Sequence, residues 1–156
     1  MINILDWRSV DAQLIHEIFT HFERELEVRK TRISVLQVDE VAKAEGENCT
    51  VMGNITRTTG HSNAFSSSGE NTYLIKIKRG MNSMHLVTTI AHEMYHVYQH
   101  ENELHGIHDR EERKKPYNDR EFEVEARDYQ RNVLFGDVIL DCANRVIRRI
   151  KRSKTI

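Results

Sequence analysis

The stretch Ala91–His100 has the sequence AHEMYHVYQH, in which histidines recur every four residues. Residues four apart lie on one face of an α-helix, about 6 Å apart along its axis. Apolar residues at helical spacing flank the stretch on both sides, which predicts a helix over residues 83–104. The histidines therefore belong to a mostly buried element, and their position there requires a chemical explanation.

His92, Glu93 and His96 form the pattern H-E-x-x-H, which is typical of zinc hydrolases. Two imidazoles at this spacing can converge on one Zn²⁺ at about 2.0–2.1 Å. Glu93 is rotated by about 100° from His92, so its carboxylate can reach water at the open coordination position and act as general base. The competing interpretation is a buried histidine pair with purely structural hydrogen bonds.

A zinc site of this kind needs a third protein ligand, and His100 is a poor candidate. It lies eight residues after His92, about 12 Å along the helix axis, so both cannot bind one ion. Another group of zinc proteases has glycine and histidine where this chain has Gln99 and Asn102. The remaining option is a carboxylate on the next helix.

The segment Arg120–Gln130, REFEVEARDYQ, offers three glutamates in a predicted helix. Glu121 and Glu125 share one face, whereas Glu123 lies with Phe122 and Ala126 on the more apolar side. We expect Glu123 to face the protein, where a metal ion would compensate the cost of its burial. Glu121 and Glu125 are expected to be solvated or to support the ligands by hydrogen bonds.

The order of predicted elements indicates an α+β fold in a single domain, 1–156. Besides the histidine helix, helices are predicted over residues 9–29, from Asp119 to about Gly136, and over 137–152. Strands are predicted over residues 32–40, 50–58 and 72–79. Lysines alternate with apolar residues along 73–79, a pattern typical of an edge strand. Polar loops over Gly60–Asn71 and His105–Asn118 are expected to shape a cleft.

Composition argues for a soluble globular protein, with 38% hydrophobic and 30% charged residues and a net charge of −1. No apolar run suggests a signal peptide or a membrane span, and Cys49 and Cys142 lack metal-site spacing, so we expect reduced thiols and a cytoplasmic location. The C-terminal helix is basic. We expect the basic face of this helix to be solvated. We expect no nucleic-acid partner, because the net charge of the chain gives no reason to expect one.

The motif residues resemble the small phage-type zinc metallopeptidases, across roughly residues 71–130. The resemblance rests on Thr89–Gln99, then Glu103-Leu104, then Phe122-Glu123-Val124-Glu125-Ala126. More widely, this segment is similar to gluzincins, which are zinc peptidases whose third ligand is a glutamate on a later helix. It implies a minimal zincin-like domain in which Glu123 is the third ligand, with a small, mainly antiparallel sheet, an active-site helix and a C-terminal glutamate-bearing helix.

The chain departs from the gluzincin pattern at Arg127, where many members have an aspartate that orients a histidine. Glu125 and Asp128 are then candidate acceptors for the histidine N–H groups. A donor for the oxyanion is also expected. Its candidates, each more often structural or exposed in proteins, are Tyr117, His105, His108 and Tyr129.

These observations predict a zinc metallopeptidase with metal ligands His92, His96 and Glu123 and general base Glu93. Its peptide or protein substrate is expected to add as a strand along residues 73–79. Two alternatives use the same residues. One is a zinc-bearing binding or structural module without catalysis, and the other is a zinc hydrolase of a non-peptide amide. The sequence does not indicate the oligomeric state.

Overall fold

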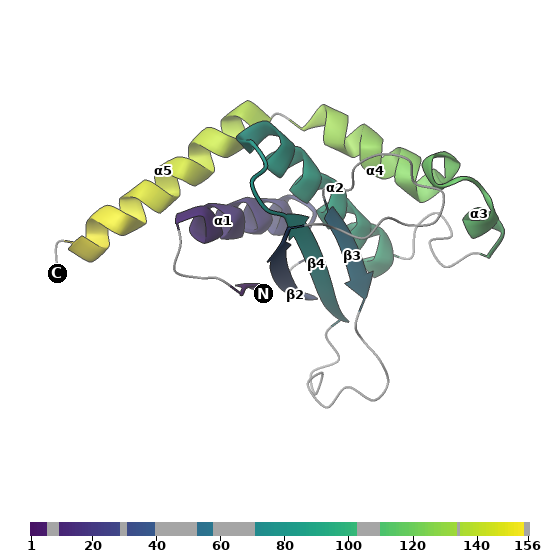
Figure 1. The fold of residues 1–156 in the computed structure, drawn as a ribbon, viewed down its shortest axis with the longest axis horizontal. Helices are drawn as coiled ribbons and strands as arrows, with labels where there is room; N and C mark the ends of the chain where they lie inside the picture. The colour runs from purple at the N-terminus through teal and green to yellow at the C-terminus, as the bar shows by residue number, and fades with distance from the viewer. Residues whose placement is uncertain are drawn as a thin grey trace.

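The computed structural model describes residues 1–5, 10–28, 31–39, 53–57, 71–102, 110–133 and 135–154. In these ranges a sheet is covered by helices (Figure 1). The strands are β1 (Ile2–Ile4), β2 (Thr31–Val38), β3 (Gly53–Arg57) and β4 (Asn71–Lys78). The helices are α1 (Val10–Glu25), α2 (Ser83–Glu101), α3 (Arg110–Lys114), α4 (Glu121–Asn132) and α5 (Phe135–Lys154), with a 3-10 turn η2 (Tyr117–Asp119) before α4.

The sheet has the strand order β1-β2-β4-β3 and is mainly parallel. β1 pairs with β2, and β2 with β4, in parallel, whereas β3 runs antiparallel to β4. The prediction of a mainly antiparallel sheet is therefore wrong, although the α+β class agrees with the structure. The physical reason is α1, which lies between β1 and β2 in the chain and provides the long crossover that parallel neighbours require.

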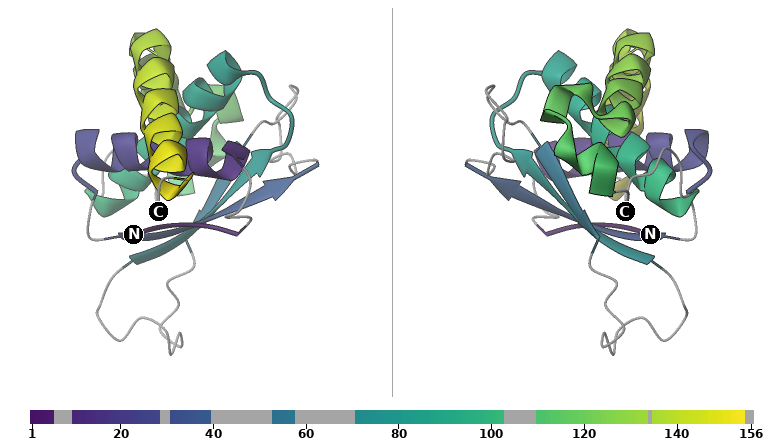
Figure 2. Two further views of the ribbon diagram at one scale, coloured as in Figure 1. Left: turned by 90° about the vertical axis from the view of Figure 1, so that its left-hand side faces the viewer. Right: turned by 90° about the vertical axis from the view of Figure 1, so that its right-hand side faces the viewer.

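The prediction that residues 73–79 form an edge strand is also wrong, because β4 lies between β2 and β3. Tyr73, Ile75 and Ile77 are buried, while Lys76 and Lys78 alternate with them and are half-buried. The lysines thus lie on the face of the sheet opposite the helices. Figure 2 shows the helices gathered on one face of the sheet. Alternating lysines here mark that uncovered face and not an edge.

The core lies between the sheet and helices α1 and α2. Aromatic and aliphatic side chains of α1 and β2 are fully buried there, with Phe19, Phe22, Ile33 and Val35 among them. α2 adds its own stripe of Val87, Ile90, Met94 and Val97. The helix begins where Asn82 accepts a hydrogen bond from the backbone N–H of His85 at 2.9 Å, a normal N-cap. The histidine stretch is thereby held firmly against the sheet.

The helices after the histidine helix differ in their bounds from the prediction. α4 begins at Glu121 after the N-cap residue Arg120, and Asp119 belongs to η2 instead of capping the helix. The break between α4 and α5 follows Val133, so Gly136 lies in the first turn of α5. α4 packs on α2, and α5 on α1. Residues 60–70 of the predicted loop Gly60–Asn71 and residues 105–109 of the predicted loop His105–Asn118 lie outside the described residues. The described part of the second loop contains α3 and most of η2.

The basic side of α5 is partly neutralised within the fold. Glu17 on α1 is 5% exposed and receives a hydrogen bond from Arg149, and Arg145 lies 3.9 Å from the same carboxylate. Arg145 and Arg149, which were predicted to be surface residues, therefore connect α5 to α1 through Glu17. None of the helices in the described part of the chain is long and apolar enough to cross a membrane.

Candidate metal centre

His92, His96 and Glu123 come together where α4 crosses α2. The Nε2 atoms of the two histidines are 3.1 Å apart. Glu123 reaches both, with Oε2 at 3.2 Å from His92 Nε2 and Oε1 at 3.0 Å from His96 Nε2. The donor atoms lie within 4.8 Å of one another, and the group could hold a metal ion. The predicted set is thus one cluster in space, although Glu123 follows His96 by 27 residues in the sequence.

The cluster is largely buried, and His92 is its most exposed member. The side chains of His96 and Glu123 are each 5% exposed, whereas that of His92 is 14% exposed. Solvent and small molecules would therefore approach the cluster from the His92 side. Catalytic zinc sites keep one coordination position open, and such a position would be reached from this side.

Gln99 fixes the orientation of His96. Its Nε2 donates to the backbone carbonyl of Phe122 at 2.9 Å, and its Oε1 lies 2.8 Å from His96 Nδ1. A carbonyl can only accept, so the amide nitrogen must face Phe122 and the amide oxygen must face His96. In its neutral, metal-binding form His96 therefore carries its proton on Nδ1, and the lone pair of Nε2 is directed at His92 and Glu123. Gln99 is fully buried, so no water competes for this arrangement.

Gln130 on α4 has the same role for His92. Its Oε1 lies 3.0 Å from His92 Nδ1. The predicted acceptors, Glu125 and Asp128, are therefore wrong: Glu125 accepts a hydrogen bond from Tyr95, and Asp128 lies 3.7 Å from Arg131. A signal was present in the sequence, because Gln130 follows Glu123 by seven residues and thus shares its helix face.

The ring nitrogens of His92 and His96 and the carboxylate of Glu123 face one another, and a positive charge between them would be stabilised. Burial alone would lower the pKa of His96, but the hydrogen bond and charge of Glu123, with the charge of Glu93, raise it to about 9. Burial would likewise raise the pKa of Glu123, yet its hydrogen bonds to His92 and His96 hold it far below the usual range. Without a metal the cluster is thus an imidazolium–carboxylate pair. A metal ion would take the place of that proton.

Glu93 is the second buried carboxylate of this region, beside Glu123. It is 5% exposed and lies one residue after His92 on α2. Its negative charge helps to raise the pKa of His96, and Glu93 is not among the three grouped donors. The two other glutamates of α4 differ from Glu123. Glu121 is exposed, and Glu125 is half-buried against Tyr95, as expected for the face away from the protein.

The other candidates do not join the cluster. The ring of His100 lies 5.9 Å from that of Tyr73, toward the sheet. The hydroxyl of Tyr129 donates to Glu25 on α1 at 2.9 Å, and Tyr117 lies under the guanidinium of Arg120. None of these contacts supports a donor for the oxyanion. His105 and His108 lie outside the described residues.

Comparison of the chain with protein-family models, with curated proteins and with solved structures gives no match. The resemblance to phage-type zinc metallopeptidases therefore rests on the motif residues of this chain alone. Any functional conclusion has to come from the geometry of His92, His96, Glu123 and Glu93.

Proposed function

We propose that this protein is a zinc-dependent metallopeptidase. The observation that carries the proposal is the close approach of the donor atoms. The two histidine Nε2 atoms lie 3.1 Å apart, one Glu123 oxygen lies 3.0 Å from His96 Nε2, and the other lies 3.2 Å from His92 Nε2. Tetrahedral zinc with bonds of about 2.0–2.1 Å has ligand atoms roughly 3.3 Å apart, close to these distances. Two histidines and one glutamate are also a common donor set of catalytic zinc, with one coordination position left open.

The chain also supplies an acid–base group close to these donors. A zinc ion held there would lower the pKa of water and polarise a carbonyl group. Glu93 would take a proton from the attacking water and pass it to the leaving amine. Its burial keeps the carboxylate out of bulk solvent. Electrostatic interactions with reacting groups are stronger in such a buried site than in water. Gln99 and Gln130 hold the two imidazoles in the protonation state that ligation requires.

The edge strand β3 is the better place for an extended peptide. Both edges of β4 are paired, so the expected strand addition along residues 73–79 is blocked. Among the described strands β3 pairs with β4 alone, and it contacts α2, the helix that carries His92 and His96. A substrate strand paired with β3 would therefore run next to the metal centre. The substrate in this proposal is a peptide or an unfolded protein.

A cytoplasmic location belongs to the same proposal. Cys142 is a free, buried thiol, and burial raises its pKa to about 11. A thiol in this state reacts little and suits a reducing compartment.

The test combines metal analysis with a cleavage assay on an unfolded protein. Wild type is expected to bind about one zinc per chain and to lose cleavage with a chelator. Glu93→Gln should retain zinc and lose cleavage, whereas Glu123→Ala should lose zinc. Glu121→Ala, an exposed acid on the same helix, is the matched control and should retain both. Zinc binding without any cleavage would favour a non-catalytic metal module. Full cleavage by Glu93→Gln would contradict the role of Glu93 as general base.

A further inference from the structure

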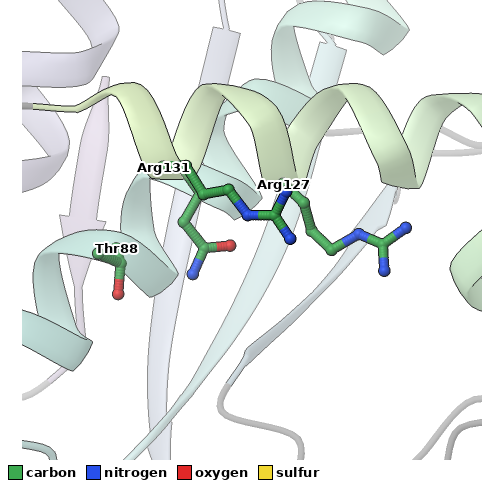
Figure 3. A pocket seen from close by; sticks show the side chains of 4 residues that line it. Thr88, Arg127 and Arg131 are labelled. Atoms are coloured by element: carbon green, nitrogen blue, oxygen red, sulfur yellow. The ribbon is translucent and has the colours of Figure 1, made fainter.

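A pocket of about 440 Å³ lies at the crossing of α2 and α4, lined by Thr88, Arg127, Gln130 and Arg131 (Figure 3). It adjoins the metal centre, because Gln130 is the residue whose Oε1 meets His92 Nδ1. Thr88 lies one helical turn before His92. The pocket is therefore one side chain away from a metal ligand, on its more exposed side.

The lining of this pocket is cationic and rich in hydrogen-bond donors. Arg127 and Arg131 are four residues apart and so share one side of α4, and Figure 3 shows both side chains on that helix with Thr88 on the neighbouring one. Gln130 turns its oxygen to His92, which leaves its amide N–H groups for another acceptor. The four described residues that line the pocket include no carboxylate.

The donors of the two arginines are only partly used within the described part of the chain. Arg127 donates one Nη2 hydrogen bond to the carbonyl of Asn118, and its Nε is buried without an acceptor. Arg131 lies 3.7 Å from Asp128, and both of these side chains are largely exposed. An exposed pair at that distance contributes little, so Arg131 can exchange it for a better partner. Thr88 gives its hydroxyl hydrogen to its own helix and serves as a wall.

We propose that this pocket binds a carboxylate group of the substrate, so that the enzyme prefers peptides with an acidic group near the bond it cleaves. A guanidinium presents a planar fork of N–H donors that matches a carboxylate, and two forks beside an amide favour that anion. The carboxylate can be an aspartate or glutamate side chain or the C-terminus of the substrate. This inference rests on the proposed peptidase function and adds the substrate class.

The test measures equilibrium binding of matched fluorescent peptides, so that it does not depend on turnover. The metal-loaded Glu93→Gln protein is titrated with three peptides of one length: an amidated peptide with internal glutamate, its glutamine counterpart, and the glutamine peptide with a free C-terminus. We expect about tenfold tighter binding of at least one carboxylate peptide at low salt, with the difference falling as salt rises. Which of the two binds tighter distinguishes the side chain from the C-terminus.

Arg127→Gln and Arg131→Gln, each in the Glu93→Gln protein, should bring the ratio of the dissociation constants close to one. Arg148→Gln on α5, far along the chain and exposed, is the matched control and should keep the ratio. Arg131→Gln guards against misfolding of the Arg127 variant, because among the described residues Arg131 loses an exposed pair with Asp128.

Equal binding of all three peptides, or a preference that survives both substitutions, would overturn the carboxylate pocket. Cleavage by wild type without an acidic preference would also overturn it and leave the peptidase function standing. A preference in binding without any cleavage would support the pocket and count against the peptidase function.

Discussion

The amide oxygen of Gln99 lies 2.8 Å from Nδ1 of His96, while the amide nitrogen of the same side chain donates to the carbonyl of Phe122. One fully buried side chain therefore orients an imidazole on α2 and fastens that helix to α4, directly before Glu123. The metal cluster is assembled by the same contact that packs the two helices. A substitution at Gln99 should consequently affect both stability and metal binding.

Replacing Gln99 by leucine removes an acceptor from His96 and leaves the Phe122 carbonyl buried without its donor. We expect the free energy of unfolding of the metal-free protein to fall by about 2–3 kcal/mol, and the metal affinity to fall by about 10- to 100-fold. Urea unfolding in chelator measures the first quantity and a competitive zinc titration the second.

Gln130→Leu is the matched comparison, because Gln130 also faces a histidine Nδ1 but is only half-buried. It should lower the metal affinity by a similar factor and cost much less stability. Equal losses of stability in the two variants would contradict the role of Gln99 as the link between the helices.

The stability of the metal-free protein is expected to depend on pH through His96 and Glu123. The pKa of His96 is raised from 6.5 to about 9, so its contribution is complete below pH 6.5 and is lost as the pH rises through 9. The pKa of Glu123 is lowered from 4.5, so its contribution is present above that value and is lost on acidification. The pair should stabilise the protein most between about pH 4.5 and 6.5.

Thermal unfolding in chelator at pH 6 and pH 9 measures this effect, which should be on the order of 2 kcal/mol. Glu123→Gln is the control, since it keeps the size of the side chain and removes the partner of His96. It also retains His16, whose pKa is lowered by burial and which therefore contributes in the opposite direction. An unchanged pH dependence in Glu123→Gln would exclude the pair as its source.

The site was largely predictable because its residues follow helix geometry. The spacing of His92 and His96 and the exclusion of His100 need only the rise and turn of one helix. Glu123 was distinguishable from Glu121 and Glu125 because Phe122 and Ala126, now seen to be buried, marked the inner face of α4. Gln99 and Gln130 were missed although each had a signal: Gln99 lies three residues after His96 on one helix, and Gln130 shares the helix face of Glu123. Only the contacts of Gln99 with Phe122 and of Gln130 with His92 depend on how the two helices cross.

The sheet was less predictable, because the alternation of apolar and polar residues along a strand does not tell whether neighbouring strands run parallel or antiparallel. Tyr73, Ile75 and Ile77 would alternate in the same way in a parallel or an antiparallel strand. β1 has three residues, too few for a pattern, and without it α1 was not recognisable as a crossover between parallel strands. The missing strand thus explains the wrong direction of the β1–β2 pair, and the parallel pairing of β2 with β4 has no signal in the alternation.

The connection between α1 and α5 through Glu17 provides a test of the basic helix. Glu17→Ala removes the buried acceptor of Arg149 and the partner of Arg145, whose Nη1 is buried. Both arginines are more than one third exposed and can turn toward water, so we expect a loss of about 1–2 kcal/mol and not that of a sealed ion pair. Urea unfolding measures the loss. Amide exchange along Phe135–Lys154 should accelerate in the variant, while Asp141→Asn, an exposed acid on α5, should leave it unchanged.

Zinc itself should stabilise the folded chain, since the ligands come together only in the fold. With free zinc at 100 times its dissociation constant, the free energy of unfolding should rise by about 2.7 kcal/mol. The rise should vanish in Glu123→Ala and persist in Glu93→Gln, because Glu93 is buried near His96 but is not among the three donors. Thermal unfolding with and without zinc measures it for each variant. Stabilisation of Glu123→Ala equal to that of wild type would show that zinc binds elsewhere, and the cluster at the crossing of α2 and α4 would then have to be abandoned as the metal centre.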